Sequence, residues 1–156
     1  MPLTRGADAG ALALPASLRA EIVAHARESA PHEACGLVAG RGGRATRVIR
    51  CANVADDPLR RYVMEPAAVM HALRSVQDAG EESADGVEGE PLAIYHSHVY
   101  SGPYPSPTDR AEARWPSSFY ILVSVRAEEP EVRAYRIRAD HPGSEKTVVE
   151  AELTEG

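Results

Sequence analysis

Two histidines near the middle of the chain have the spacing of ligands for one metal ion. His96 and His98 follow the apolar run Leu92 to Tyr95, which predicts a strand. Side chains two residues apart in a strand point to the same face, about 6.6 Å apart, so both histidines can converge on one ion while Ser97 points away. Taken alone, the pattern fits two hydrogen-bonded histidines of a partly buried strand equally well.

Asp109 is the natural third ligand, because a catalytic zinc ion needs three protein ligands and an open position for water. Seven residues separate His98 from Ser106, and two separate Ser106 from Asp109. This length allows a loop to leave the strand and a helix to bring the carboxylate back. The segment is also a good helix start, with Ser106 as N-cap and Pro107 in the first turn, so by itself it would indicate only a cap. The combined pattern is much less expected by chance.

With Glu33 upstream, the pattern resembles the complete signature of the JAMM (MPN+) metallopeptidases. The resemblance extends over roughly residues 15–150 and is similar to the bacterial branch in the segments 32–40 (HEACGLVAG), 62–66, 94–98 (IYHSH), 104–109 (YPSPTD) and 119–124 (FYILVS). Within that branch the chain most resembles peptidases that release cysteine from the C-terminus of a ubiquitin-like sulfur carrier protein.

This resemblance implies a fold and a set of roles. The fold is α/β (α+β), the JAMM/MPN or cytidine-deaminase-like fold, with a curved mixed β-sheet flanked by helices. One catalytic Zn²⁺ is held by His96, His98 and Asp109, and zinc lowers the pKa of bound water to about 7. Glu33 takes a proton and returns it to the leaving amine, although its position alone would suggest an exposed carboxylate after a helix. Ser106 donates a hydrogen bond to the tetrahedral intermediate, a role that its capping could exclude.

The resemblance also implies a substrate and partners. The substrate is the amide bond after the C-terminal Gly-Gly of a ubiquitin-like sulfur carrier protein, with cysteine or a related amino acid released, in sulfur metabolism or in making a sulfur-containing product. A cysteine-synthase-like enzyme and a second copy in a homodimer are further partners to test. Two alternatives stay open: an isopeptidase that removes ubiquitin-like modifiers from protein lysines, and a non-catalytic MPN scaffold, which typically lacks part of the signature.

An extended tail requires a groove, and proteins often bind such tails at a sheet edge. Arg60 to Met64 is the predicted edge strand, with Tyr62 in it, and the loop containing Tyr100 and Tyr104 is the predicted second wall. The alternative is an ordinary strand and an ordinary connecting loop.

The elements that must position these residues follow from apolar periodicity and turn residues. Helices are expected at Leu14 to Ser29, after Pro66, and from Ser106. Strands are expected at 35–40 and 45–53, paired as a hairpin, and at 60–64, 92–98, 119–125, 131–138 and 147–153. No internal repeat or linker divides the 156 residues. We therefore expect one peptidase domain over 14–153 behind a flexible tail, 1–13.

Charge is uneven along the chain. The net charge of −6 argues against nucleic acid as a partner. Residues 78–90 hold six of the 23 acidic residues and no Lys or Arg, which leaves 17 acidic against 17 basic residues elsewhere. This acidic loop is expected to be solvated, or otherwise to recognise a basic partner.

The remaining features exclude other classes of protein. No apolar run approaches the roughly 20 residues of a membrane span, and no convincing signal peptide is present, so we expect a cytoplasmic protein without membrane contact. Cys35 and Cys51 are expected as buried, reduced thiols. The histidines outside the signature lack the spacing of a second metal site and are expected at the surface: His25, His32, His71 and His141.

Overall fold

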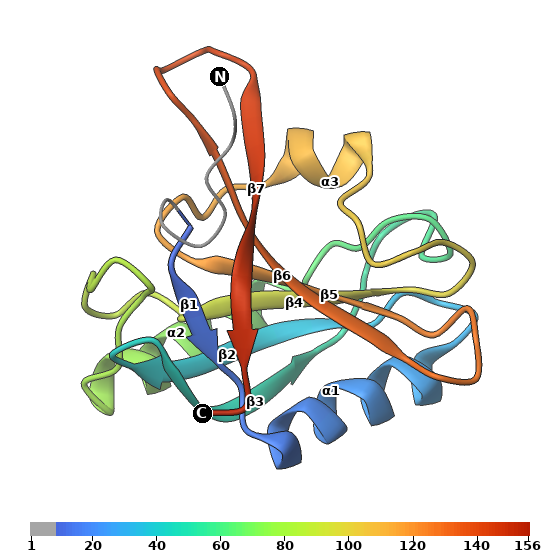
Figure 1. Cartoon of the computed structure of the whole chain (residues 1–156), viewed down its shortest axis with the longest axis horizontal. Coiled ribbons are helices and arrows are strands. Elements are labelled where there is room, and N and C mark those ends of the chain that lie inside the picture. Colours follow the sequence, from blue (N-terminus) through green and yellow to red (C-terminus); the bar gives the residue numbers. More distant parts are fainter. Residues whose placement is uncertain (1–8) are drawn as a thin grey trace.

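Seven strands and three helices form the described part of the chain, residues 9–156, in the computed structural model of the protein (Figure 1). In chain order they are β1 (Ala11–Ala13), α1 (Ala16–Ser29), β2 (Cys35–Arg41), β3 (Arg44–Cys51), α2 (Pro66–Asp78), β4 (Ala93–His98), α3 (Pro107–Glu112), β5 (Phe119–Ser124), β6 (Glu131–Ala139) and β7 (Lys146–Thr154). The predicted helices and the predicted β2–β3 hairpin are confirmed.

The strands share one sheet in the order β1-β3-β2-β4-β5-β6-β7, which closes because β1 pairs with both β3 and β7. The pairs β4–β5, β1–β3 and β1–β7 are parallel, and the others are antiparallel. The sheet is therefore mixed and curved, as expected, and its curvature continues to closure. Strand β4, which carries both signature histidines, is paired with β2 on one side and with β5 on the other.

Alternation along β4 separates two hydrophobic cores. Tyr95 packs on the side covered by α1, whose buried residues include Ile22, whereas Ile94 packs on the other side, with Ala72 of α2. Because alternate residues of a strand share a face, His96 and His98 lie on the same face as Ile94. In Figure 1, α1 and α3 lie on opposite sides of the sheet. The histidines therefore point away from α1.

The expected flexible tail is wrong for its last residues. Ala9 and Leu12 are fully buried, and β1 supplies the pairing that closes the sheet. Residues 1–8, the rest of that tail, lie outside the described residues. A strand of three residues is too short to show the alternation by which a strand is found in a sequence.

The expected edge strand at Arg60 to Met64 is also wrong. Met64 makes only an isolated bridge with Asn53. Beyond this bridge the segment bonds to the Asn53 side chain instead of to a neighbouring strand. Oδ1 of Asn53 accepts from Val63 N at 3.0 Å, and its Nδ2 donates to the Arg61 carbonyl at 3.1 Å. Such side-chain bonds compete with regular pairing.

The acidic loop is less solvated than expected. Glu81 is buried and pairs with Arg47 at 2.7 Å, and Asp85 pairs with the buried Arg136 at 2.6 Å. Two carboxylates therefore anchor this loop to the sheet, whereas residues 85–88 are exposed.

Cysteines and remaining histidines mostly follow expectation. Cys35 and Cys51 are buried, free thiols at paired positions of β2 and β3. His32, His71 and His141 are exposed. His25 differs, because it is half-buried and its Nδ1 lies 2.6 Å from the Tyr95 hydroxyl. None of the helices in the described chain is long and apolar enough to span a membrane.

Candidate metal centre

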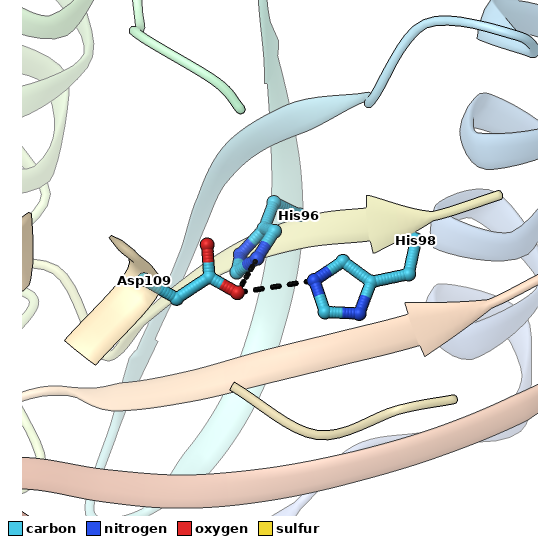
Figure 2. Close-up of side chains that lie close together, drawn as sticks. All are labelled: His96, His98 and Asp109. Carbon is cyan, nitrogen blue, oxygen red and sulfur yellow. Dashed lines mark hydrogen bonds and ion pairs between the residues drawn. The ribbon is translucent and has the colours of Figure 1, made fainter. Parts of the chain in front are cut away.

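The three predicted metal ligands converge. Figure 2 shows His96 and His98 on β4 facing Asp109 on α3, and Nε2 of each histidine lies 3.0 Å from Oδ2 of Asp109. All three side chains are buried, and their candidate ligand atoms lie within 4.8 Å of one another. This donor set, two imidazole nitrogens and one carboxylate oxygen, is one that binds divalent metal ions.

The helix cap and the metal site share an atom. Ser106 N donates to Oδ2 of Asp109 at 2.9 Å, while Asp109 N donates to Ser106 Oγ at 3.0 Å, which makes a complete capping box. In the capping box Ser106 Oγ accepts, and no hydrogen bond donated by its hydroxyl is found among residues 9–156. The two readings of this segment are therefore compatible, because the cap orients the carboxylate.

His98 is held in one tautomer by the loop that follows it. Its Nδ1 lies 2.8 Å from the Gly102 carbonyl oxygen, which can only accept, so Nδ1 carries a proton. In the neutral ring Nε2 then presents a lone pair to the Asp109 carboxylate 3.0 Å away, and a proton or a metal ion between these two atoms satisfies both. This is the usual arrangement of a metal-bound histidine.

His96 has no hydrogen bond that could serve the same purpose. Both of its ring nitrogens are buried and lack a hydrogen-bond partner within the described structure, although Nε2 approaches Asp109. Buried polar atoms normally have hydrogen-bond partners, so an unpartnered ring nitrogen among other possible metal ligands indicates a place for a cation.

Protonation states also suit a metal site. Burial lowers the pKa of His96, which favours the neutral ring. Burial would raise the pKa of Asp109, but the neighbouring histidines and Ser106 N outweigh it and hold this pKa below its usual range. Burial would lower the pKa of His98, but its bonds to Asp109 and Gly102 raise it. A metal ion bound at Nε2 of His98 would displace the proton from that nitrogen.

Glu33 lies beside the cluster, between α1 and β2. It is buried, its Oε1 has no hydrogen-bond partner in the described chain, and burial raises its pKa from 4.5 to about 7 although His98 acts in the opposite direction. Its backbone is fixed, since Glu33 N donates to the Pro58 carbonyl at 2.8 Å. A carboxyl with a pKa near neutrality is suited to general acid–base chemistry.

Of the three residues predicted to line a substrate groove, Tyr62 alone lies beside the metal ligands. The ring of Tyr62 stacks on His96, with centroids 4.3 Å apart, and it lines a cleft of about 170 Å³ beside Asp109. Tyr100 and Tyr104 are exposed, at 74% and 55%, and neither lines that cleft. Tyr104 instead packs near the Arg133 guanidinium, 5.7 Å from its ring centroid. Sequence reasoning missed Gly102 and Asn53, because they act through a carbonyl and an amide that no spacing rule predicts.

The protein-family model described as prokaryotic homologues of the JAB domain matches residues 15–138 of the sequence. The chain belongs to this family. The chain is 38% identical over 129 residues to the CysO-cysteine peptidase of Mycobacterium tuberculosis, and the match covers 81% of this chain and 82% of the relative. It is 35% identical to a desampylase of Haloferax volcanii, with coverage of 72% and 80%. It is 39% identical to a probable TtuB-protein conjugate cleaving protease of Thermus thermophilus, with coverage of 71% and 69%.

Solved structures agree with the fold. A solution structure of a Desulfitobacterium hafniense protein superposes with a TM-score of 0.74 at 28% identity, covering 91% of this chain and 90% of that one. A JAB1/MPN domain protein from Archaeoglobus fulgidus superposes with a TM-score of 0.55 at 18% identity, covering 92% and 100%, which supports the fold alone. The chain therefore has the JAMM/MPN fold, and the family model together with the peptidase relatives makes it a hydrolase of the metallopeptidase class.

Proposed function

We propose that this protein is a zinc-dependent peptidase that hydrolyses the amide bond after the C-terminal Gly-Gly of a ubiquitin-like sulfur carrier protein, releasing cysteine or a related amino acid. The convergence of His96, His98 and Asp109 beside the buried Glu33 carries the proposal. The names of the relatives support the substrate class, since one is a CysO-cysteine peptidase and another a TtuB-protein conjugate cleaving protease.

His96, His98 and Asp109 would hold the ion, with two nitrogens and one oxygen, and three protein ligands leave a fourth position free. A zinc ion so bound supplies Lewis acidity and lowers the pKa of water. The chain's own contribution is to keep His96 neutral and the Asp109 carboxylate ionised, and to turn Nε2 of His98 towards the ion. Ser106 N and the Gly102 carbonyl then fix the orientation of Asp109 and His98.

Glu33 would act as the proton carrier. Its unpartnered Oε1 accepts the proton of the attacking water and then gives that proton to the nitrogen of the leaving amine, so the amide C–N bond breaks without expelling an anionic amine. The site around it is buried, which keeps bulk water from competing. A pKa near 7 allows both transfers at neutral pH.

Ser106 would stabilise charge on the reacting carbonyl oxygen. Its hydroxyl proton is free because Oγ accepts from Asp109 N, so the same side chain can cap α3 and donate to a developing oxyanion. The capping bond fixes where that donor is held, which is a requirement for electrostatic stabilisation of a transition state.

The cleft beside Asp109 would receive the tail of the carrier. The backbone of residues 62–64 would form one wall and Trp115 would contribute to the other. The backbone N–H and C=O groups of Tyr62 and Met64 have no hydrogen-bond partner within residues 9–156, so an extended peptide can bond to them although this segment is not a regular strand. A narrow cleft suits Gly-Gly, which has no side chains. Tyr100 and Tyr104 would then contact the carrier outside the cleft.

The second candidate is an isopeptidase that removes ubiquitin-like modifiers from protein lysines. It is favoured by the relative named a probable TtuB-protein conjugate cleaving protease. A non-catalytic scaffold is disfavoured, because Glu33, Ser106 and the three ligands are all present. A cysteine-synthase-like partner, a homodimer and a cytoplasmic location stay predictions.

The two substrates differ only in the leaving amine, so one comparison separates them. The zinc-loaded protein is incubated with a Gly-Gly carrier joined to free cysteine, and in parallel with the same carrier joined to the ε-amine of a protein lysine. The proposal expects a kcat/KM at least tenfold higher for the cysteine adduct. Faster cleavage of the lysine conjugate establishes the isopeptidase instead.

A further inference from the structure

The two histidines of the metal centre are held by different means. His98 donates from Nδ1 to a carbonyl, the bond by which ligand histidines are ordinarily oriented. His96 makes no such bond in the described structure, and yet it is the more buried ring, at 2% exposed against 5%. Apart from the 3.0 Å contact of its Nε2 with Asp109, packing is what fixes the plane of His96.

Tyr62 is the side chain in position to do so. Its ring lies over His96 with centroids 4.3 Å apart and planes inclined by 25°, and His98 contacts His96 through an edge, at 5.2 Å and 68°. Offset stacked rings attract one another, and a packed ring excludes other orientations of its neighbour. The Tyr62 hydroxyl has no hydrogen-bond partner among residues 9–156, so the ring face makes the contact.

Asn53 fixes Tyr62 in turn. Its side chain bonds the residues on both sides of Tyr62, through Val63 N at 3.0 Å and the Arg61 carbonyl at 3.1 Å. The same Nδ2 also donates to the Glu33 carbonyl at 3.0 Å. One amide thus joins the segment of the stacking ring to the backbone of the proton carrier.

We propose that Tyr62 is a positioning residue, whose stacked ring takes the place of the missing hydrogen bond of His96, and that Asn53 holds this ring and Glu33 in a fixed relation. The proposal rests on the proposed metal site and changes the role expected of Tyr62, from a wall for substrate to a support for a ligand. Loss of the ring should therefore weaken metal binding and turnover rather than substrate binding.

The test compares the full-length protein with Tyr62→Leu and with Tyr62→Phe, the matched control that keeps the ring. Zn²⁺ affinity is measured by competition with a chromophoric chelator, and the absorption spectrum of Co²⁺ reports the ligand geometry. We expect Tyr62→Phe to match the wild type in Zn²⁺ affinity and in the Co²⁺ spectrum. Tyr62→Leu should lose about 10- to 100-fold in affinity, shift the Co²⁺ bands and lower kcat with KM unchanged.

Wild-type affinity and spectrum in Tyr62→Leu overturn the proposal, and so does a change confined to KM, which assigns Tyr62 to substrate binding. Failure of the wild type itself to bind Zn²⁺ overturns the metal site instead, so the two failures are distinguishable. Thermal unfolding of the metal-free forms detects misfolding, and Tyr62→Met replaces Tyr62→Leu if the latter does not fold.

A second experiment changes Asn53 instead of Tyr62. Asn53→Ala should weaken Zn²⁺ affinity while Tyr62 is intact, and the double variant with Tyr62→Leu should be no weaker than Tyr62→Leu alone, because both changes remove the same support. Additive losses show that Asn53 does not act through Tyr62 and overturn that part of the proposal.

Discussion

Ser106 and Asp109 bond to each other twice, and the Asp109 oxygen that accepts from Ser106 N at 2.9 Å is the one that faces both histidines. The start of α3 therefore both caps a helix and orients a ligand. A change at Ser106 should act on stability and on chemistry together.

Ser106→Ala should lower kcat by about 10²- to 10³-fold, since it removes a donor to the oxyanion. It should also cost about 1 kcal/mol of stability, because the cap is lost. Ser106→Thr, which keeps the hydroxyl, is the control and should retain the stability. Steady-state kinetics and urea unfolding measure the two effects. Equal kcat in Ser106→Ala and wild type would show that the hydroxyl only caps.

Asp109→Asn should abolish stoichiometric zinc binding, because it replaces the one anionic ligand with a neutral amide. Metal content after dialysis measures this, by elemental analysis. Asp78→Asn, at the exposed end of α2, removes the same charge outside the ligand cluster and should bind zinc as the wild type does. Retention of one zinc ion by Asp109→Asn would remove Asp109 from the ligand set.

Glu33 gives a prediction about pH in the metal-free protein. Burial raises its pKa from 4.5 to about 7, against the opposing effect of His98, so folding favours the protonated carboxyl. That contribution is complete below pH 4.5 and is lost as the pH rises to about 7. A glutamine does not titrate, so the Glu33→Gln variant does not lose this stability as the pH rises.

The stability of Glu33→Gln relative to the wild type should therefore increase between pH 5 and pH 8, by about 2 kcal/mol. Urea unfolding in the presence of a chelator measures it, and His32→Gln, one residue earlier and exposed, is the control. A difference that does not change with pH would show that the Glu33 carboxyl is not perturbed.

Much of the metal centre could be predicted from spacing. The period of a strand places His96 and His98 on one face, and the helix-start pattern at Ser106 brings Asp109 to the same place. These are local rules, and the structure follows them. What could not be predicted depends on side chains that bond to distant backbone: Asn53 to Arg61 and Val63, and His98 to Gly102.

The fold shows the same division. Helices and the longer strands follow from periodicity, whereas β1 is too short to show any. The acidic loop is anchored by Arg136, which lies 51 residues after Asp85 in the chain. A charge run in a sequence carries no information about a partner so far away, so solvation was the natural but incomplete expectation.

Tyr100 and Tyr104 test how the carrier binds outside the cleft. Replacing both with Ala should raise KM for the carrier substrate several-fold and leave kcat and zinc content unchanged, because neither residue touches the metal ligands. Kinetics with the whole carrier, compared with those for a short peptide ending in the same Gly-Gly adduct, measure this. An unchanged KM for the whole carrier would place the carrier elsewhere on the protein.

The proposed peptidase activity is tested most directly by following the intact mass of a Gly-Gly carrier with a C-terminal cysteine during incubation with the zinc-loaded protein. The carrier should lose the mass of one cysteine residue. This loss should stop when a chelator removes zinc, resume when zinc is restored, and slow by about 10²- to 10⁴-fold in Glu33→Gln. An unchanged carrier mass with zinc bound would contradict the proposed substrate, and cleavage that persists without metal or at full rate in Glu33→Gln would contradict the mechanism.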